Sequence, residues 1–579
     1  GLFRTQTATT QGAFLRWHLL KDADAECSTP DAQTPVANWV VEAAGSYTVY
    51  GNTNPDGAYQ FFIDTGAYQV SVQTPQQIWW SVCDSTQTVV LDTPLDADTV
   101  DFAAVALADC PLMTVDLAIP MLRRCFDNAV FVYYCNQGSE TADSARVEVQ
   151  IDPYLALVSS AQPYENLGNN RYRFHIGSVV PGQCGQFSLT VNVDCDSTVI
   201  GQTHCLLAHG YPDTLCTQVP NWSGAEIQAA VSCQDSLLHF ELRNSGLAPS
   251  QPLEYIIIED DVVLMTGQEQ YSPGEVFGVD LPANGHTWRI ESDQEPGHPF
   301  SNMALAFAEG CGGFQTLGFI NQFSVDAFTP SWDQECVENT GSYDPNDKQG
   351  FPFGTGSEHL IRPGQDLEYL IRFQNTGTDT AFTVVVRDTL SSWLDPASVR
   401  PGAASHPYTW TLSGAGIIAF TFNHILLPDS NVNEAASHGF VSFRVAQRAD
   451  VPLGTEIRND AAIYFDFNAP VITNETWHTV GVLPVTGVSG PPHRPAPSEI
   501  LLTPQPAVSY ALIQRADGRP FHRHHLYLTD AWGRLVRQTE LNGAAARLER
   551  GQLDAGVYFL RILDLNGQTA GSRRLIFLP

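Results

Sequence analysis

Short runs in which apolar and polar residues alternate pattern the chain almost throughout. Examples are YQVSVQ at 68–73, RVEVQI at 146–151, LEYLIRF at 367–373 and FVSFRV at 440–445. Turn-forming residues separate such runs, and no convincing amphipathic helical period is found. A period of two is typical of strands with one buried face. The pattern therefore predicts an all-β chain made of serial β-sandwiches.

One combination of runs occurs three times, at 131–152, 238–260 and 369–390. In each copy, an alternating run meets Asn-x-Gly, and a second alternating run ends on an acidic residue. The three motifs are Asn136/Gly138, Asn244/Gly246 and Asn375/Gly377. Repetition at about a domain length indicates serial domains of one kind. We interpret each Asn-x-Gly as the turn of the central hairpin of an immunoglobulin-like sandwich, with glycine allowing a positive φ.

These observations and the length of 579 residues predict five domains and one linker. The first domain is expected to be a β-sandwich of a different kind, and the next three to be immunoglobulin-like. A segment rich in Pro and Gly is expected to be a semi-extended linker before a small C-terminal sandwich. In chain order the expected segments are 1–108, 109–215, 216–340, 341–480, the linker 481–499, and 500–579.

The composition is that of a globular protein with a strong negative charge. Hydrophobic residues make up 43% of the chain, and 63 acidic residues outweigh 29 basic ones to give a formal charge of −34. Only two residues are lysines, Lys21 and Lys348. This balance repels nucleic acids and anionic membranes. No apolar run reaches the roughly 18 residues that span a bilayer. Because no signal peptide is found, Gly1 is interpreted as a processed or truncated end.

The twelve cysteines all lie between Cys27 and Cys336, and each predicted domain contains an even number. Even counts favour disulfides within domains and an oxidising compartment. We expect Cys110 to pair with Cys125, and Cys216 with Cys233. Zinc bound by His204, Cys205 and His209 is the alternative, although no C-x2-C pair supports it. The expected disulfide cysteines are Cys27, Cys83, Cys110, Cys125, Cys135, Cys184, Cys195, Cys205, Cys216, Cys233, Cys311 and Cys336.

Two groups of acidic and amide side chains are candidate calcium ligands. Oxygens two residues apart can converge on one hard cation, although the EF-hand glycine is absent. A solvated acidic turn is the alternative in the first group, and an Asx turn is the alternative in the second. The first group is Asp22, Asp24, Glu26 and Asp31, and the second is Asp344, Asn346 and Asp347.

No motif for a nucleophile, a metalloprotease or a phosphate loop is found, which favours a non-enzymatic protein. A pair of carboxylates for glycoside hydrolysis remains an open alternative, because sequence spacing does not reveal it. The adjacent Trp79 and Trp80 could form a carbohydrate platform. Alternation predicts that one of them faces the core and that only the other is available to a sugar.

Three parts of the chain resemble known families. The segments TNPDGAY and TGAYQVSV make residues 1–108 similar to the small prealbumin-like sandwiches found as carboxypeptidase regulatory-type or collagen-adhesin B-type domains, which serve as stalks and spacers. Segments from SYDPNDKQG to YFDFNAPVITN make residues 341–480 similar to a conserved-repeat β-sandwich family of unassigned function. That family recurs near the C-termini of large surface proteins of gliding-type Gram-negative bacteria, which implies a location rather than an activity.

The C-terminal segment resembles the type A sorting domain of the type IX secretion system, which delivers cargo across the outer membrane. The usual opening is altered to Thr503-Pro504-Gln505-Pro506, and a basic strand ends the chain. Residues 489–579 contain eleven arginines and seven acidic residues. This local positive charge suggests docking on a neighbouring subunit or on residues 341–480. The matching motif residues are Asp530, Gly533, Arg534, Gly556 and Tyr558.

The sequence therefore predicts a secreted, cell-surface protein without catalytic activity. We expect the C-terminal part of a large adhesin or filament, exported by the type IX machinery, with calcium as a ligand and an unidentified cell-surface or carbohydrate partner. The alternative is the accessory and sorting tail of a secreted hydrolase whose catalytic domain precedes residue 1.

Overall fold

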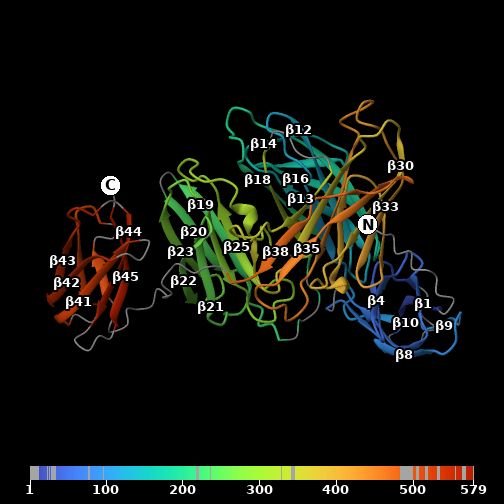
Figure 1. Cartoon of the computed structure of the whole chain (residues 1–579), viewed down its shortest axis with the longest axis horizontal. Helices are drawn as coiled ribbons and strands as arrows, with labels where there is room; N and C mark the ends of the chain where they lie inside the picture. The colour runs from blue at the N-terminus through green and yellow to red at the C-terminus, as the bar shows by residue number, and fades with distance from the viewer. Residues whose placement is uncertain are drawn as a thin grey trace. The chain divides into compact units, whose positions relative to one another are not determined.

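The computed structural model describes residues 12–482 and 500–577, with short gaps. The gaps are 23, 25–26, 28–33, 76–77, 96, 215, 217–218, 220, 235–236, 328, 341–345, 504–506, 516–518, 531–534, 554–555 and 564–568. Residues 1–250 and 271–483 form one compact unit, and residues 251–270 and 484–579 form another. The described residues form β-strands and short 3-10 turns without an α-helix (Figure 1). The predicted all-β fold class is confirmed.

The first sandwich shows the predicted alternation most clearly. In one of its strands, Tyr68, Val70 and Val72 are buried, whereas Gln69 is exposed. One sheet has the order β4-β3-β6-β8, and the other has β2-β1-β10-β7 with β5 and β9 also paired to β1. The strands are β1 (Gly12–Asp22), β2 (Thr34–Pro35), β3 (Val40–Ala44), β4 (Thr48–Asn52), β5 (Ala58–Asp64), β6 (Gly66–Gln73), β7 (Trp80–Val82), β8 (Thr86–Leu91), β9 (Ala97–Thr99) and β10 (Phe102–Ala106).

The second sandwich is completed by a strand from much later in the chain. Its sheets have the orders β11-β12-β17-β14 and β15-β16-β13-β18-β26. Because β26 pairs with β18, the strands between them form an insertion, and the predicted boundaries at 215 and 340 do not separate the sandwiches cleanly. The strands are β11 (Met113–Ala118), β12 (Asp127–Asn136), β13 (Ala142–Gln150), β14 (Leu155–Ser160), β15 (Tyr164–Gly168), β16 (Arg171–Val179), β17 (Cys184–Val193), β18 (Thr203–Tyr211) and β26 (Trp332–Glu338).

The inserted segment contributes its own strands to the first compact unit. Its sheet β19-β20-β23 lies in this unit, and β24 pairs with β25. The elements are β19 (Ile227–Gln234), β20 (Leu237–Asn244), β23 (Val276–Pro282), β24 (Trp288–Asp293), β25 (Met303–Ala308) and the 3-10 turn η2 (Ile320–Gln322).

The last sandwich of this unit has the largest apolar core, which lies between the sheets β27-β29-β34-β31 and β32-β33-β30-β36-β37. A smaller sheet, β28-β38-β35, closes one side. The elements are β27 (Asp347–Phe351), β28 (Leu360–Ile361), β29 (Leu367–Gln374), β30 (Ala381–Thr389), the 3-10 turn η3 (Pro396–Ser398), β31 (Arg400–Ala404), β32 (Thr409–Ser413), β33 (Ile417–Leu427), β34 (His438–Val445), β35 (Glu456–Asn459), β36 (Ala461–Phe465), β37 (Val471–Ile472) and β38 (Thr476–Val480).

The second compact unit contains a hairpin and a small sandwich. The hairpin is β21 (Leu253–Glu259) paired with β22 (Val262–Glu269). The sandwich has sheets β39-β40-β43 and β42-β41-β44-β45 around a core of its own. Its strands are β39 (Ile500–Thr503), β40 (Tyr510–Arg515), β41 (Phe521–Asp530), β42 (Leu535–Gly543), β43 (Ala545–Glu549), β44 (Gly556–Leu563) and β45 (Thr569–Phe577).

The repeated Asn-x-Gly motif links strand ends in the same way in all three copies. The Asn136 amide donates to the carbonyls of Glu140 (2.8 Å) and Val179 (2.9 Å), and its oxygen accepts from the Gly138 and Leu112 amides. Since Val179 ends a strand of the opposite sheet, this asparagine joins the two sheets at one end. The same donations run from Asn244 to Ala248 and Tyr271, and from Asn375 to Asp379 and Leu427.

The glycines of these motifs have a different role from the one the sequence suggested. None of Gly138, Gly246 and Gly377 has a positive φ. Instead, a Cβ at Gly138 would lie 2.4 Å from the carbonyl oxygen of Cys110, and one at Gly246 would lie 2.2 Å from that of Gly224. Close approach of neighbouring backbone, rather than turn geometry, therefore requires glycine at these two positions.

The first and last sandwiches of this unit are in direct contact. The Tyr50 amide donates to the Gly414 carbonyl at 2.8 Å, and the Leu412 amide donates to Asn52 Oδ1 at 2.9 Å. The Trp410 indole donates to Asn38 Oδ1 at 3.0 Å. Because these bonds join β4 to β32, the first sandwich packs on a domain that lies some 360 residues further along the chain.

We predict that Asn375→Ala destabilises the last sandwich by about 1–3 kcal/mol, since it leaves the buried Leu427 carbonyl without its donor and removes the hydrogen bond to the carbonyl of the exposed Asp379. Asn431→Ala, at an exposed asparagine of the same sandwich, is the matched control and should leave the stability unchanged. Urea unfolding followed by tryptophan fluorescence measures both variants. Equal effects of the two substitutions would contradict the role assigned to the Asn-x-Gly motif.

Candidate functional site

A single buried guanidinium joins the second and last sandwiches. Arg444 on β34 makes ion pairs with Asp333 on β26, with Glu368 on β29 (3.0 Å) and with Asp326 (3.2 Å). A more distant pair reaches Asp116 on β11, at 3.7 Å. The partners come from three separate stretches of the chain, so this ionic junction forms only when those stretches are folded together.

Burial perturbs the acid–base properties of the junction. It raises the pKa of Asp116 to about 6, although Arg444 opposes this shift. It also raises the pKa of Glu368 and of the nearby Glu335 well above the ordinary value, and neighbouring carboxylates add to both shifts. Burial alone would lower the pKa of Arg444, but the surrounding carboxylates raise it. One permanent cation therefore faces several acids that are costly to ionise together.

Contacts other than ion pairs extend the junction. The Asp116 carboxylate accepts a hydrogen bond from the Ala403 amide at 2.7 Å. The rings of Phe131 and Phe440 meet edge to face, with centroids 4.8 Å apart. Arg372 donates to the carbonyl of Pro120 at 2.6 Å. Charge, aromatic packing and backbone hydrogen bonds thus fasten the two sandwiches at several points, which restricts their relative motion.

The second predicted calcium group lies beside this junction and already has protein partners. The Asp347 carboxylate accepts hydrogen bonds from both Nε and Nη2 of Arg372, and the bond from Nε measures 2.6 Å. Asn346 Oδ1 accepts from the Gln374 amide at 3.1 Å. Asp344 lies outside the described residues. The observed contacts give Asp347 and Asn346 a structural role, and calcium binding at this group stays a prediction.

The first predicted calcium group is described only in part. The Asp22 carboxylate is buried and accepts hydrogen bonds from the amides of Asp24 (3.1 Å) and Cys27 (2.8 Å). It lies within 4.8 Å of the sulfurs of Cys27 and Cys83, but these are joined in a disulfide. The carboxylate therefore orders the turn beside that disulfide. Glu26 and Asp31 lie outside the described residues, and calcium binding here stays a prediction.

All twelve cysteines form disulfides, as expected, but the predicted pairs Cys110–Cys125 and Cys216–Cys233 are wrong. Cys205 and Cys336 face each other on β18 and β26, so their link closes within one sheet although it crosses a predicted domain boundary. The Cys110–Cys216 link crosses the same boundary, since Cys216 follows the last strand before the insertion. The six links are Cys27–Cys83, Cys110–Cys216, Cys125–Cys195, Cys135–Cys184, Cys205–Cys336 and Cys233–Cys311.

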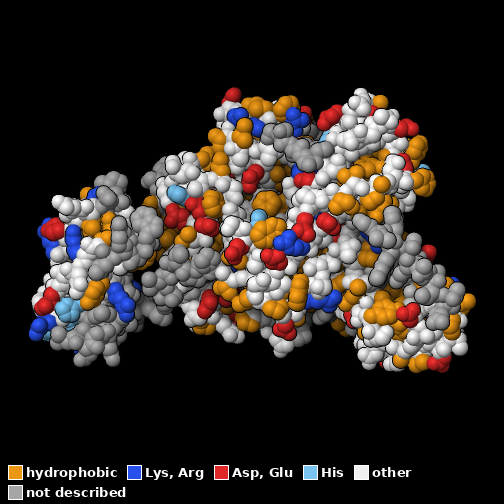
Figure 2. All heavy atoms as spheres, viewed as in Figure 1, with side chains coloured by type: hydrophobic (Ala, Val, Ile, Leu, Met, Phe, Trp, Pro, Cys, Tyr) orange, Lys and Arg blue, Asp and Glu red, His pale blue; other side chains and the backbone are white. Residues whose placement is uncertain are grey.

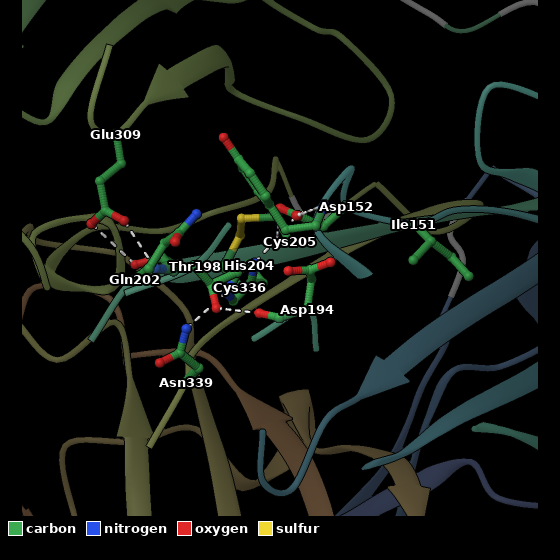
Figure 3. A network of polar contacts seen from close by, with 12 residues as sticks. Ile151, Asp152, Asp194, Thr198, Gln202, His204, Cys205, Glu309, Cys336 and Asn339 are labelled. Carbon is green, nitrogen blue, oxygen red and sulfur yellow. Dashed lines mark hydrogen bonds and ion pairs between the residues drawn. A yellow bond between two sulfur atoms is a disulfide. The ribbon is translucent and has the colours of Figure 1, made fainter. Parts of the chain in front are cut away.

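The zinc alternative at His204, Cys205 and His209 is also wrong. Figure 3 shows the Cys205 disulfide beside His204, whose Nδ1 lies 3.2 Å from Asp152 and whose Nε2 accepts from Asn339 at 3.0 Å. His209 Nε2 lies 2.7 Å from a carboxylate oxygen of Asp213. The sulfur and all these nitrogens are thus engaged by the protein, and they stabilise the place where the chain returns to the second sandwich.

Both tryptophans of the predicted carbohydrate platform are buried. Trp79 is 0% and Trp80 is 6% exposed. Trp79 stacks on Phe300 of the inserted segment, while Trp80 packs on Trp39 and donates to the Gln137 carbonyl at 3.0 Å. The prediction that one ring would be available to a sugar is wrong, because a neighbouring domain covers the face that alternation had placed outside.

The described residues of the sorting motif lie on adjacent strands. Asp530 ends β41 and pairs with Tyr558 on β44, a strand that begins at Gly556. The Tyr558 ring is buried against Phe577, with centroids 5.9 Å apart. Gly533 and Arg534 lie outside the described residues. The motif therefore includes part of the core of the small C-terminal sandwich.

The sequence interpretation missed the ionic junction. A signal was present in the segment Trp332–Cys336, where Asp333 and Glu335 occupy alternate positions of a strand that also carries a buried cysteine. Two acids on one face of such a strand indicate burial against a cation rather than solvation. The partner Arg444 lies in a distant apolar strand, so the pairing itself carried no local signal.

Comparison with known proteins adds one family match. Residues 344–479 match a family described as a domain of unknown function, DUF7619. No curated protein matches the chain. In the part of the chain that the structure describes, no helix is long and apolar enough to cross a membrane.

Several solved structures of bacterial surface proteins align with the chain at low similarity. They include the major pilin SpaD of Corynebacterium diphtheriae (8% identity, 51% of this chain, 91% of that one, TM-score 0.17). The collagen adhesin of S. aureus aligns with 8% identity over 65% of this chain and 93% of that one, with a TM-score of 0.17. The pilus protein RrgB of Streptococcus pneumoniae aligns with 6% identity over 67% and 75%, with a TM-score of 0.23. With TM-scores this low, we draw no functional conclusion from them.

We predict that Arg444→Ala destabilises the first compact unit by about 3–5 kcal/mol, because it leaves buried carboxylates without their cation. Arg458→Ala is the matched control. Arg458 also pairs with two carboxylates, those of Glu456 and Glu475, but it is half exposed and solvent screens the pairs. Urea unfolding should therefore shift strongly for the first variant and hardly for the second. Equal shifts of the unfolding midpoint in the two variants would contradict the stabilising role assigned to Arg444.

The junction also predicts a pH dependence. Because the pKa of Asp116 is raised from 3.8 to about 6, the folded state holds a proton that the unfolded state has already released in that interval. The stability of the wild type relative to Asp116→Asn should therefore fall as the pH rises from about 4 to about 6, and change little above it. Thermal melting of both proteins across this range measures the difference, and parallel curves would contradict it.

Proposed function

We propose that the chain is the C-terminal part of an extracellular structural or adhesive protein that the type IX secretion system exports. The observation that carries the proposal is the set of six disulfides, two of which join cysteines 106 and 131 residues apart in the chain. Disulfides of this density form and persist in oxidising surroundings outside the cytosol. They support a location outside the cytosol without reference to any relative.

The packing of the first unit supports a mechanical rather than a catalytic role. The buried Arg444 is used in ion pairs between sandwiches, and the aromatic rings of Trp79 and Phe440 are used in joints between domains. Such joints convert a series of small domains into a stiff body, which suits a stalk or a filament segment. On the face seen in Figure 2, acidic side chains are scattered among polar and apolar ones, which favours solubility in an exposed location.

Export through type IX secretion is supported by the C-terminal sandwich. Its strands β41 and β44 bring the motif residues Asp530 and Tyr558 side by side. The linker composition before it and its positive charge distinguish it from the acidic remainder of the chain. These features match those expected of a module that the secretion machinery recognises independently of its cargo.

We predict that deletion of residues 500–579 prevents surface display in a bacterium with an active type IX system, because the recognised module is lost. The full chain should become accessible to antibody on intact cells, whereas the truncated chain should accumulate in the periplasm. A strain that lacks the secretion pore is the control, and it should retain both forms. Equal surface display of the full and truncated chains would contradict the proposed export route.

A further inference from the structure

One of the two lysines of the chain is completely enclosed in the core of the last sandwich. Lys348 on β27 is 1% exposed, and its ammonium lies 4.1 Å from the ring centroid of Tyr369 and 5.8 Å from that of Phe443. Lysine is almost never fully buried unless paired, because its charge loses the hydration that water provides. The rings of Tyr369 and Phe443 do not replace that hydration in full, so the ammonium depends on polar groups within the same pocket.

Two further polar side chains share this apolar pocket. Asp388 on β30 is fully buried and accepts from Lys348 Nζ through Oδ2. Asn459, the last residue of β35, is 3% exposed and lies close enough to Asp388 and to the Tyr369 hydroxyl to lower the pKa of both. The strand register explains the proximity, because Asp388 pairs with Ala461, two positions beyond the asparagine. An amine, a carboxyl and a carboxamide thus meet in one pocket.

A simple buried ion pair does not account for this arrangement. Such pairs stabilise only when further hydrogen bonds satisfy their remaining polar atoms. Here Asp388 Oδ1, both side-chain atoms of Asn459 and the Tyr369 hydroxyl are buried without a hydrogen bond of normal geometry. An amide group with both its donor and its acceptor unsatisfied destabilises the fold, and native structures rarely retain one without another role.

We propose that Lys348 and Asn459 form an intramolecular amide bond, and that Asp388 transfers the protons that its formation requires. The Nζ lone pair attacks Cγ of Asn459 while the Asp388 carboxyl donates a hydrogen bond to the amide oxygen. The carboxyl group then relays a proton from Nζ to the amide nitrogen, the Cγ–Nδ2 bond breaks, and ammonia leaves. One C–N bond forms and one breaks, so the step needs no oxidant, reductant or cofactor.

The pocket supplies the protonation states that this step needs. Burial lowers the pKa of Lys348, which favours the neutral and nucleophilic amine, although Asp388 opposes the shift. Burial raises the pKa of Asp388, which favours the protonated carboxyl, although Lys348 opposes it. The fold also holds the reacting groups together, which can replace a very high concentration of an external amine. Exclusion of water prevents hydrolysis of the amide from competing.

The bond would fasten the one region of the first unit that has no disulfide. No cysteine follows Cys336, so the last sandwich contains none. Lys348 lies on its first strand, and Asn459 lies near its end on the small closing sheet. The link would close the sandwich covalently, much as Cys205–Cys336 closes the second sandwich, and it would resist reducing agents.

The proposal is tested by intact mass spectrometry of the purified, fully reduced chain. The wild type should be lighter than its sequence mass by one ammonia. Trypsin should not cleave after Lys348, and the peptide containing it should appear joined to the peptide containing Asn459. Lys21→Arg is the matched control at the other lysine and should retain the mass loss. Lys348→Met and Asn459→Ala should each restore the full mass.

Asp388→Asn tests the proton transfer separately, and it should abolish or greatly slow the mass loss. Circular dichroism of each variant confirms that the sandwich still folds. A wild-type chain of full sequence mass, with free cleavage after Lys348, would overturn the proposal. A mass loss that persists in Lys348→Met would also overturn it, because the ammonia would then come from another reaction, such as cyclisation at Asn459-Asp460.

Discussion

The burial of Arg444 among acidic side chains constrains how the first compact unit is assembled. A buried cation must be matched by carboxylates in fixed positions, because an unmatched charge of either sign is costly away from water. The partners of Arg444 lie on β11, on β26 and its preceding loop, and on β29. These strands must lie in fixed positions relative to one another for all of these ion pairs to form. The junction therefore selects a specific packing of sandwiches, whereas apolar contact alone would tolerate sliding.

The strand β26 connects this junction to the covalent structure of the second sandwich. It carries Asp333 and Glu335 toward the last sandwich, and it carries Cys336 toward Cys205 on β18. The second sandwich is therefore incomplete until the inserted segment has been synthesised and the chain has returned. Such long-range pairing slows folding, because the chain loses the entropy of loop closure before the stabilising contacts form. The disulfide then retains the closed arrangement once it has formed.

Local features of the fold could be predicted from the sequence, whereas long-range ones could not. Alternation identified the strands, and the repeats around Asn136, Asn244 and Asn375 identified related sandwiches, because both signals lie within a few residues. The return of β26 carries no such signal, and it caused the errors in the domain boundaries and in the cysteine pairing. Burial of both Trp79 and Trp80 was missed for the same reason, since alternation describes one sheet and not the domain that covers it.

The Cys205–Cys336 link has a consequence for a protein that is pulled along its length. Tension applied at the two ends of the first unit enters β18 and reaches β26 through the sulfur–sulfur bond. Because the Cys110–Cys216 link also brings tension to Cys216, only the residues from Cys216 to Cys336, which contain the inserted segment, lie outside the shortest covalent path and are protected from extension. The inserted segment is therefore shielded from tension, while the second and last sandwiches bear it.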